Sequence, residues 1–354
     1  MSATNGLAEI SWYSGDFERA VELYSQVLEI RLQTLGEDHN DTLTAKNNLA
    51  VGLLGMGRNR ESLPLLESVH SARSQRLGQH HEKTLVSAGN LAIALSRLGL
   101  IERSLSLNEE IVAISEQVRG PESPSTLNAR NTLAINHMRV GNLERSRQLH
   151  EINYAIRRRI HGHDHPETLW NMNNLATTLR VIGDFEQARR LEEHTLAANR
   201  MQFGEAHPDT LWSMSSLAET LNELGDHDQA LALIESAVAG RREALGETHQ
   251  LTLRSEHVHA RVLKSTGALT QASSALEPVL TAQIELLGPK HADTLNTAVL
   301  LVEILRALGL HDKADAVFRR DLQWLLASPF EQVEPALQGL FRRVSDLGTE
   351  SGAS

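Results

Sequence analysis

The chain has 354 residues, of which 34 are lysine or arginine and 45 are aspartate or glutamate, so its formal net charge is −11. This acidic balance argues against nucleic-acid binding, which needs a basic surface, and the absence of cysteine excludes disulfides and thiolate metal sites. The first residues lack a signal-peptide pattern, and no apolar run approaches the roughly 18 residues of a membrane span. We therefore expect a cytoplasmic protein without membrane contact. Arginine greatly outnumbers lysine, a bias that we interpret as that of a bacterial protein.

A period of 42 residues, without insertions, organises the chain. Seven threonines follow this period and each precedes a leucine: Thr42, Thr84, Thr126, Thr168, Thr210, Thr252 and Thr294. A glycine stands 15 residues after each of them: Gly57, Gly99, Gly141, Gly183, Gly225, Gly267 and Gly309. A second glycine column precedes the threonines: Gly36, Gly78, Gly120, Gly162, Gly204, Gly246 and Gly288. Such a period indicates a repeat protein in which each unit packs on its neighbours.

Each repeat is predicted to form two helices. In residues 168–183, apolar side chains fall 1, 4, 7, 8 and 11 residues after the threonine, which is one face of a helix. The position eight residues after the threonine is alanine in six repeats: Ala50, Ala92, Ala134, Ala176, Ala218 and Ala260. The second helix has its own column of small residues: Ala20, Ser62, Ser104, Ser146, Ala188, Ala230, Ala272 and Ala314. We expect these small residues to let the two helices approach closely.

The sequence also predicts where the helices begin and end. Three residues before the threonines stand His39, His81, Ser123, His165, His207, His249 and His291. Proline follows this position in three repeats, and proline favours the first helical position, so the residue before it is predicted to be the N-cap. Serine is a standard cap, which fits Ser123. At the other end, Gly183 fits a left-handed C-cap, and Asp184 can cap the second helix.

These features resemble the tetratricopeptide repeat (TPR), in the 42-residue form found in kinesin light chains and their bacterial relatives. The HPETL and HPDTL sequences at 165–169 and 207–211, the NNLA core at 173–176 and the closing glycine carry the resemblance. It implies an all-α fold, an α-solenoid wound as a right-handed superhelix of about eight helix hairpins, in a single array over 1–347. The expected repeats are 1–41, 42–83, 84–125, 126–167, 168–209, 210–251, 252–293 and 294–335, followed by a capping helix at 336–347 and a disordered tail at 348–354.

Motifs for catalysis and metal binding are missing from the sequence, which contains no G-x-x-x-x-G-K-[ST], H-E-x-x-H or G-x-S-x-G pattern. His161, His163 and His165 lie close together, but they fall in a turn, and His165 belongs to the capping column. We therefore expect solvated turn histidines and neither a metal site nor a cofactor. His137 and His259 stand in apolar columns, so we expect both to be packed in the core.

The resemblance also implies where a ligand binds. In TPR arrays the first helices line a concave groove, and positions 2, 5, 9, 12 and 13 after the threonine face it, with position 6 at its margin. Asparagine can pair with both groups of a peptide bond, arginine suits a carboxylate or an acidic peptide, and tryptophan is a common anchor. The predicted peptide-binding groove comprises Asn47, Asn48, Asn90, Arg97, Asn128, Asn131, Arg139, Trp170, Asn173, Asn174, Arg180, Trp212, Glu219 and Asn222.

Each of these features has a structural alternative. The asparagines could bond only within the array, the arginines could be solvated near helix C-termini, where cations complement the helix dipole, and the tryptophans could pack against the preceding repeat. In the C-terminal half other residues replace the asparagines, namely Ser215, Ser216, His257, Val258, Val299 and Leu300. Charged residues enter at other positions of these helices, which suggests a second partner or self-association there: Glu219, Glu223, Glu303, Arg254, Arg261, Lys264 and Arg306.

Three hypotheses for the function remain open at this point. The first is a non-enzymatic scaffold that binds an extended, acidic peptide or protein segment in the groove. The second is the sensor region of a larger bacterial signalling protein of the nucleotide-binding switch ATPase type. The third is an enzyme with a site in the concave face, for which His137, Glu219 and Glu223 are the candidates. We favour the first, because the sequence shows no general-base arrangement.

Overall fold

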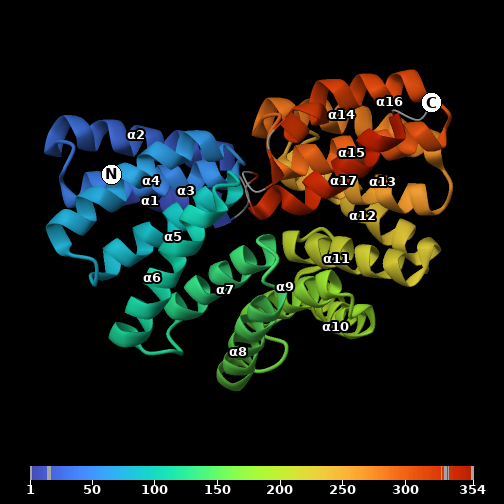
Figure 1. Cartoon of the computed structure of the whole chain (residues 1–354). Coiled ribbons are helices and arrows are strands. Elements are labelled where there is room, and N and C mark those ends of the chain that lie inside the picture. The colour runs from blue at the N-terminus through green and yellow to red at the C-terminus, as the bar shows by residue number, and fades with distance from the viewer. Residues whose placement is uncertain (1, 14–16, 328, 331–332, 334, 352–354) are drawn as a thin grey trace. The chain divides into compact units, whose positions relative to one another are not determined.

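The computed structural model describes residues 2–13, 17–327, 329–330, 333 and 335–351, and these residues form helices and connecting turns without a β-strand (Figure 1). The first helices of the repeats are α1 (Ser2–Tyr13), α3 (Asn40–Gly55), α5 (Glu82–Arg97), α7 (Pro124–Arg139), α9 (Pro166–Ile182), α11 (Pro208–Leu224), α13 (Gln250–Ser265) and α15 (Ala292–Ala307). The second helices are α2 (Phe17–Leu35), α4 (Asn59–Leu77), α6 (Ile101–Arg119), α8 (Leu143–His161), α10 (Phe185–Phe203), α12 (His227–Leu245), α14 (Leu269–Leu287) and α16 (His311–Val317). The predicted all-α repeat fold is confirmed. None of the helices described is long and apolar enough to cross a membrane.

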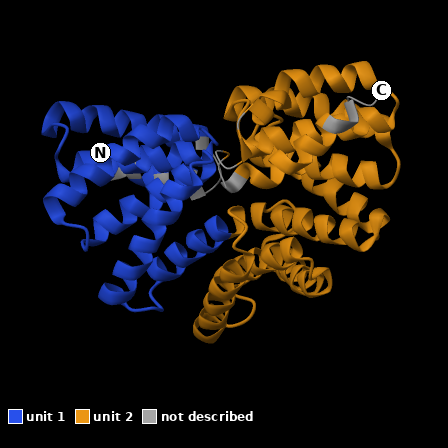
Figure 2. Cartoon of the chain, viewed as in Figure 1, with its two compact units in different colours: residues 1–137 blue, residues 138–354 orange. Residues whose placement is uncertain are grey.

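The chain divides into two compact units, residues 1–137 (unit 1) and 138–354 (unit 2), as Figure 2 shows. The boundary falls inside α7, so this helix contributes residues to both units. Helices α1 to α6 in unit 1 and helices α8 to α16 in unit 2 each pack against the next helix of the series. This sequential packing is the arrangement expected of stacked helical hairpins.

The two columns of small residues hold each hairpin together. All six alanines of the first-helix column and all eight residues of the second-helix column are 0% exposed. In α9, Leu169, Met172 and Leu179 are buried on the same face as Ala176. Ser62 and Ser104 also bond the first helix of their own hairpin, as when Ser104 donates to the Ala92 carbonyl at 2.7 Å. The close approach predicted from these columns is therefore observed.

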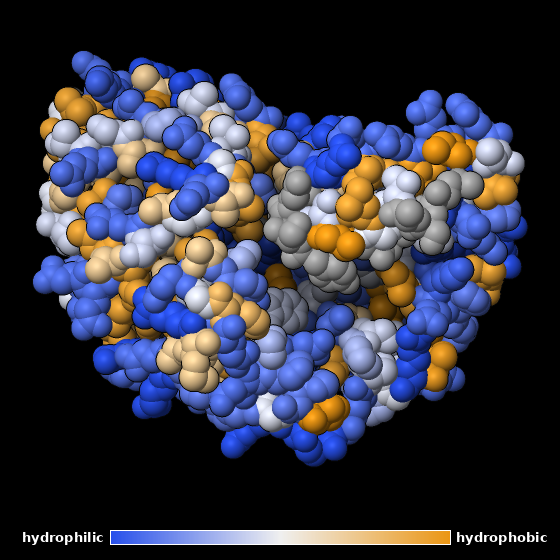
Figure 3. All heavy atoms as spheres, turned by 180° about the vertical axis from the view of Figure 1, so that it is seen from behind, coloured by the Kyte–Doolittle hydropathy of each residue, from blue (hydrophilic) through white to orange (hydrophobic). Residues whose placement is uncertain are grey.

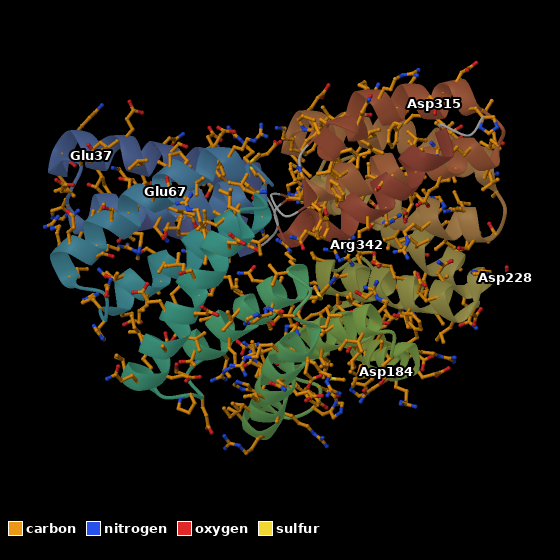
Figure 4. All side chains as sticks on the ribbon, in the orientation of Figure 1. Glu37, Glu67, Asp184, Asp228, Asp315 and Arg342 are labelled. Atoms are coloured by element: carbon orange, nitrogen blue, oxygen red, sulfur yellow. The ribbon has the colours of Figure 1, made fainter. Side chains whose placement is uncertain are left out.

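The two glycine columns account for all residues with positive φ in the described ranges. Gly183, which ends α9, has φ 98° and ψ 7°, the left-handed conformation that favours glycine. Its N–H bonds the carbonyls of Leu179 and Arg180, which satisfies acceptors at the helix C-terminus. Asp184, labelled in Figure 4, then caps α10 by accepting from the Gln187 N–H at 3.2 Å. Both predicted caps are confirmed.

The histidine column caps the first helices, as predicted. Each histidine accepts, through Nδ1, from the backbone N–H two residues later, at 3.1–3.3 Å: His39, His81, His165, His207, His249 and His291. Ser123 takes the same role by accepting from the Thr126 N–H at 3.2 Å. This bond satisfies one of the donors left free in the first turn of a helix.

Arginines at one repeat position, not identified from the sequence, tie four of the second helices (α2, α4, α8 and α12) to the start of the next first helix. Arg73, Arg157 and Arg241 are 5% exposed or less. Each donates to the backbone carbonyl ten residues later, at 3.0–3.1 Å. Arg31 makes the corresponding bond to the Asp41 carbonyl at 2.6 Å. These bonds fix the turn between successive repeats.

The C-terminal end departs from the regular pattern. After α16 the chain continues as a π-helical turn (Phe318–Leu322) and a 3₁₀ turn (Gln323–Ala327), and α17 (Pro335–Ser351) follows. Helix α17 contains the predicted cap 336–347 and buries Leu340 and Val344 against the end of the array. Residues 348–351, which we expected to belong to a disordered tail, form the last turn of α17, where Gly348 lies beside Phe318 and Leu326. Residues 352–354 lie outside the described part of the chain.

Candidate functional site

In unit 2 the first helices lie side by side, since α9 contacts α11, α11 contacts α13 and α13 contacts α15. In unit 1, α3 contacts α5 in the same way. Side chains at equal distances from the repeat threonine therefore come from neighbouring helices. We call the side chains at positions 2, 5, 9, 12 and 13 of α9, α11, α13 and α15 the first-helix face of unit 2.

Several amides of the predicted asparagine ladder form hydrogen bonds within the protein. Asn47 accepts from the Asn90 side-chain amide at 3.0 Å, and the fully buried Asn173 donates to the Ser213 hydroxyl at 2.8 Å. For these amides the structural alternative describes the contacts observed. The remaining predicted amides differ in exposure: Asn131 and Asn174 are buried, Asn48 and Asn222 are half-buried, and Asn128 is exposed.

The three predicted arginines lie in different surroundings. In unit 1, Arg97 donates to the Leu54 carbonyl of the preceding first helix at 2.6 Å. In unit 2, Arg180 forms an ion pair with Glu219, and the two side chains are only 11% and 12% exposed. Arg139 is exposed. The guanidinium of Arg180 is therefore engaged by a carboxylate of the protein itself.

The ion pair continues along the first-helix face of unit 2. Arg261 of α13 contacts Glu219 at 3.5 Å and Glu223 at 2.5 Å. Although burial alone would raise it, nearby arginines hold the pKa of Glu219 below its usual value. Further along, the Glu303 carboxylate of α15 forms ion pairs with Lys264 at 2.6 Å and with Arg343 of α17 at 2.9 Å. Positions 9 and 12 of this face are thus occupied by a network of internal ion pairs.

Position 2 of the same face is different. It carries Trp170 on α9, Trp212 on α11 and Arg254 on α13. Both tryptophans are half-buried, and the Arg157 guanidinium lies 5.5 Å from the Trp170 ring centroid. Arg254 is exposed and, among the described residues, has no hydrogen-bond or ion-pair partner. This row presents two partly accessible indole rings and one guanidinium that is free for an incoming acceptor.

Arg254 and Arg139 both lower the pKa of one carboxylate, that of Asp293 at the start of α15. Burial would raise the pKa of Asp293, but His291, Arg254 and Arg139 together hold it below its usual value. Both arginines are exposed, so the Asp293 carboxylate lies in a positive potential that comes from surface side chains. The sequence predicted Arg254 among the charged residues of the C-terminal half but not in the peptide-binding groove, because its column varies from Asn128 to Trp170 and Trp212 and does not by itself mark arginine as special.

The candidate catalytic residues are held in structural contacts. His137 is buried at 8% exposure, as expected for a packed core residue. Glu219 and Glu223 both pair with Arg261. His259, expected in the core, is half-buried and lies 3.9 Å from Glu235. A carboxylate with a lowered pKa is a poor proton donor near neutral pH, so Glu219 lacks the property that general-acid catalysis needs.

The surface view in Figure 3 shows apolar residues interspersed among a majority of hydrophilic ones. Single exposed apolar residues are ordinary on protein surfaces. We therefore place the candidate site on the row of position 2, where aromatic and cationic groups lie on adjacent helices.

Comparisons with known proteins agree with this architecture. The tetratricopeptide repeat family profile matches residues 1–75, 41–117, 83–151, 125–201, 194–243 and 209–283. No curated protein matches the sequence.

Among solved structures, the putative kinesin light chain TPR-like repeats of Podosopora anserina share 27% identity over 57% of this chain and 95% of their own, with a TM-score of 0.47. BtubC (BKLC) from P. vanneervenii shares 20% identity over 65% of this chain and 92% of its own, with a TM-score of 0.51. A Rap protein complexed with competence and sporulation factor shares 13% identity over 80% of this chain and 77% of its own, with a TM-score of 0.60. The last two similarities concern the fold alone. From the repeat geometry and the family match over most of its length, the chain belongs to the tetratricopeptide repeat family.

Proposed function

We propose that this chain is a non-enzymatic interaction module that binds an extended peptide or protein segment carrying a carboxylate. Tetratricopeptide arrays are scaffolds for protein–protein interaction, which gives the class of function. The position proposed for the ligand is the row of Trp170, Trp212 and Arg254 on the first-helix face of unit 2. The observation that carries this proposal is that three successive first helices carry, at the same position, two half-buried tryptophans and an exposed arginine that has no hydrogen-bond or ion-pair partner among the described residues.

The charge of the face favours an acidic ligand. It carries more cationic than anionic side chains, although the whole chain has a net charge of −11: Arg180, Arg254, Arg261, Lys264 and Arg306 against Glu219, Glu223 and Glu303. Several of these side chains are already paired within the protein. Arg306, for example, lies 3.9 Å from Asp315, a residue labelled in Figure 4. Arg254, which has no hydrogen-bond or ion-pair partner among the described residues, remains available at the surface, and a planar guanidinium binds a carboxylate through two parallel bonds.

The tryptophans supply the apolar part of the interaction. A half-buried indole ring loses little side-chain freedom on binding, and such rings are common among the residues that dominate binding energy. We expect apolar side chains of the ligand to lie on Trp170 and Trp212, while its carboxylate reaches Arg254. A peptide that combines an acidic group with a neighbouring apolar residue fits this arrangement best.

The experiment that tests the proposal is selection from a random peptide library on the full chain, followed by titration of the selected peptides at two salt concentrations. Selected sequences should be enriched in acidic and apolar residues, and affinity should fall as salt rises, because exposed charges are screened. Trp212→Ala should weaken binding by at least about tenfold, in the range of a binding hot spot. Selection of basic peptides, or binding that is unaffected by Trp212→Ala, would contradict the proposal.

A further inference from the structure

A second group of side chains in unit 2 lies outside the proposed binding face and has the composition of a metal site. His163 and Asp164 come from the turn between α8 and α9, and His194 comes from α10. One imidazole nitrogen of each histidine and one carboxylate oxygen of Asp164 lie within 4.8 Å of one another. We propose that His163, Asp164 and His194 bind a divalent transition-metal ion such as Zn²⁺ or Ni²⁺.

The separations fit one ion of this kind. His194 Nε2 lies 2.7 Å from Asp164 Oδ1, and His163 Nδ1 lies 3.5 Å from the same oxygen. Two ligands that are each about 2.1 Å from a tetrahedral ion lie roughly 3.4 Å apart. Small side-chain rotations therefore bring all three atoms to bonding distance, and a water molecule or a fourth donor can complete the coordination.

The environment of His163 prepares its Nδ1 atom for a metal. This nitrogen is covered by the protein and has no hydrogen-bond partner in the described part of the chain. The other ring nitrogen, Nε2, lies 3.4 Å from the Tyr154 hydroxyl. If Nε2 carries the proton and donates to Tyr154, the Nδ1 lone pair is available, which is how metal-binding histidines are usually oriented by an outer partner.

The turn itself is held in place for this role. Gln202 of α10 donates to the Asp164 carbonyl at 2.6 Å, and the His163 and His194 rings meet edge to face at 4.2 Å between centroids. His161 and His165 are not part of the group, since they stack on each other and His165 Nδ1 caps α9. A bound ion would therefore connect the turn before α9 to the middle of α10 and stiffen the joint between two repeats.

The repeat architecture does not itself require these residues. At the position of His163 the other repeats carry Glu37, Gln79, Pro121, Glu205, Glu247 and Pro289. At the position of His194 they carry Gln26, Ser68, Glu110, Ile152, Ser236 and Pro278. Histidine occurs once at each position, in two consecutive repeats, and there the two side chains meet. Sequence reasoning expected solvated histidines here, because His194 lies about thirty residues away and its approach is visible only in three dimensions.

The test is calorimetric titration of the full chain, without any histidine tag, with Zn²⁺ and separately with Ni²⁺. We expect saturable binding of one ion per chain and a rise of the melting temperature by about 2–5 °C, because an ion that binds only the folded state stabilises it. His163→Ala and His194→Ala should each weaken binding by at least about tenfold, the lower end of the effect of losing even an outer partner. Circular dichroism checks that the variants keep their helix content.

The matched controls are His80→Ala, in the equivalent turn of another repeat, and His161→Ala, next to the proposed site. Both should leave metal affinity unchanged. Titration with Co²⁺ gives an independent readout, since a tetrahedral site with nitrogen and oxygen ligands produces a visible absorption that His194→Ala should abolish. Absence of stoichiometric binding would overturn the proposal, as would binding that depends on His161 and is insensitive to His163→Ala and His194→Ala.

Discussion

The Arg180 guanidinium of α9 is ion-paired with the Glu219 carboxylate of α11, and the two side chains are only 11% and 12% exposed. Removing one partner of such a covered pair leaves the other charge uncompensated. We therefore expect Arg180→Ala to lower the free energy of unfolding by about 3 kcal/mol. Arg254→Ala, which removes an exposed and unpaired arginine, should change it by less than about 0.5 kcal/mol. Urea denaturation of the two variants makes the comparison, and equal effects would show that Arg180 is not a structural residue.

The buried Glu192 of α10 is expected to make stability depend on pH. Burial raises the pKa of Glu192 from 4.5 to about 7, against the lowering effect of Arg180. The folded protein therefore keeps a proton that the unfolded chain loses. The stabilising contribution is complete below pH 4.5, and it disappears as the pH rises through 7. Its full size corresponds to about 3 kcal/mol.

Replacement of Glu192 by glutamine keeps the shape of the side chain and removes the titration. Between pH 4.5 and about pH 7, the window between the two pKa values, Glu192→Gln should show a flatter dependence of unfolding free energy on pH than the unmodified chain. Glu193→Gln, at the neighbouring exposed glutamate that pairs with Arg189, is the control and should keep the original slope. Chemical denaturation at several pH values measures both. Parallel curves for the chain and Glu192→Gln would contradict the assignment.

The capping histidines provide a third prediction. His81 Nδ1 accepts from the Lys83 N–H at 3.1 Å, so His81→Ala should cost about 0.5–2 kcal/mol, the range for a lost N-cap. His81→Ser should cost much less, because serine performs the same function at Ser123. Thermal unfolding of the two variants distinguishes them. If both substitutions were silent, the histidine column would have to be explained by something other than capping.

The features that repeat along the chain could be predicted from the sequence, and the contacts between repeats could not. Columns such as Gly183 and Ala176 have one local role each, which is a left-handed turn or a close helix contact, so spacing alone identifies them. Asn173 was predicted to bind a ligand from its position within its own helix alone. Its actual partner, Ser213, lies forty residues further along the chain.

Contacts between neighbouring repeats depend on how far one first helix is displaced along the next. Arg180 pairs with Glu219, which lies three positions before the residue equivalent to Arg180 in the next repeat. Asn47 bonds Asn90, which lies one position after the residue equivalent to Asn47. No single displacement describes both pairs, because each side chain reaches in its own direction. This is also why Arg254, which is left unpaired, could not be distinguished from Arg180 before the structure was known.

The central claim is that an acidic ligand binds the row of Trp170, Trp212 and Arg254. The most direct measurement is titration of a selected peptide, with an intact carboxylate and with that carboxylate amidated, against the full chain, Arg254→Ala and the control Arg189→Ala on α10. A charge-assisted bond contributes about 1.5–3 kcal/mol, so Arg254→Ala should weaken binding of the acidic peptide by roughly tenfold to a hundredfold. The amidated peptide should bind the chain and Arg254→Ala almost equally, and Arg189→Ala should bind like the unmodified chain. Equal losses for Arg254→Ala and Arg189→Ala, or no loss for either, would contradict the proposed binding site.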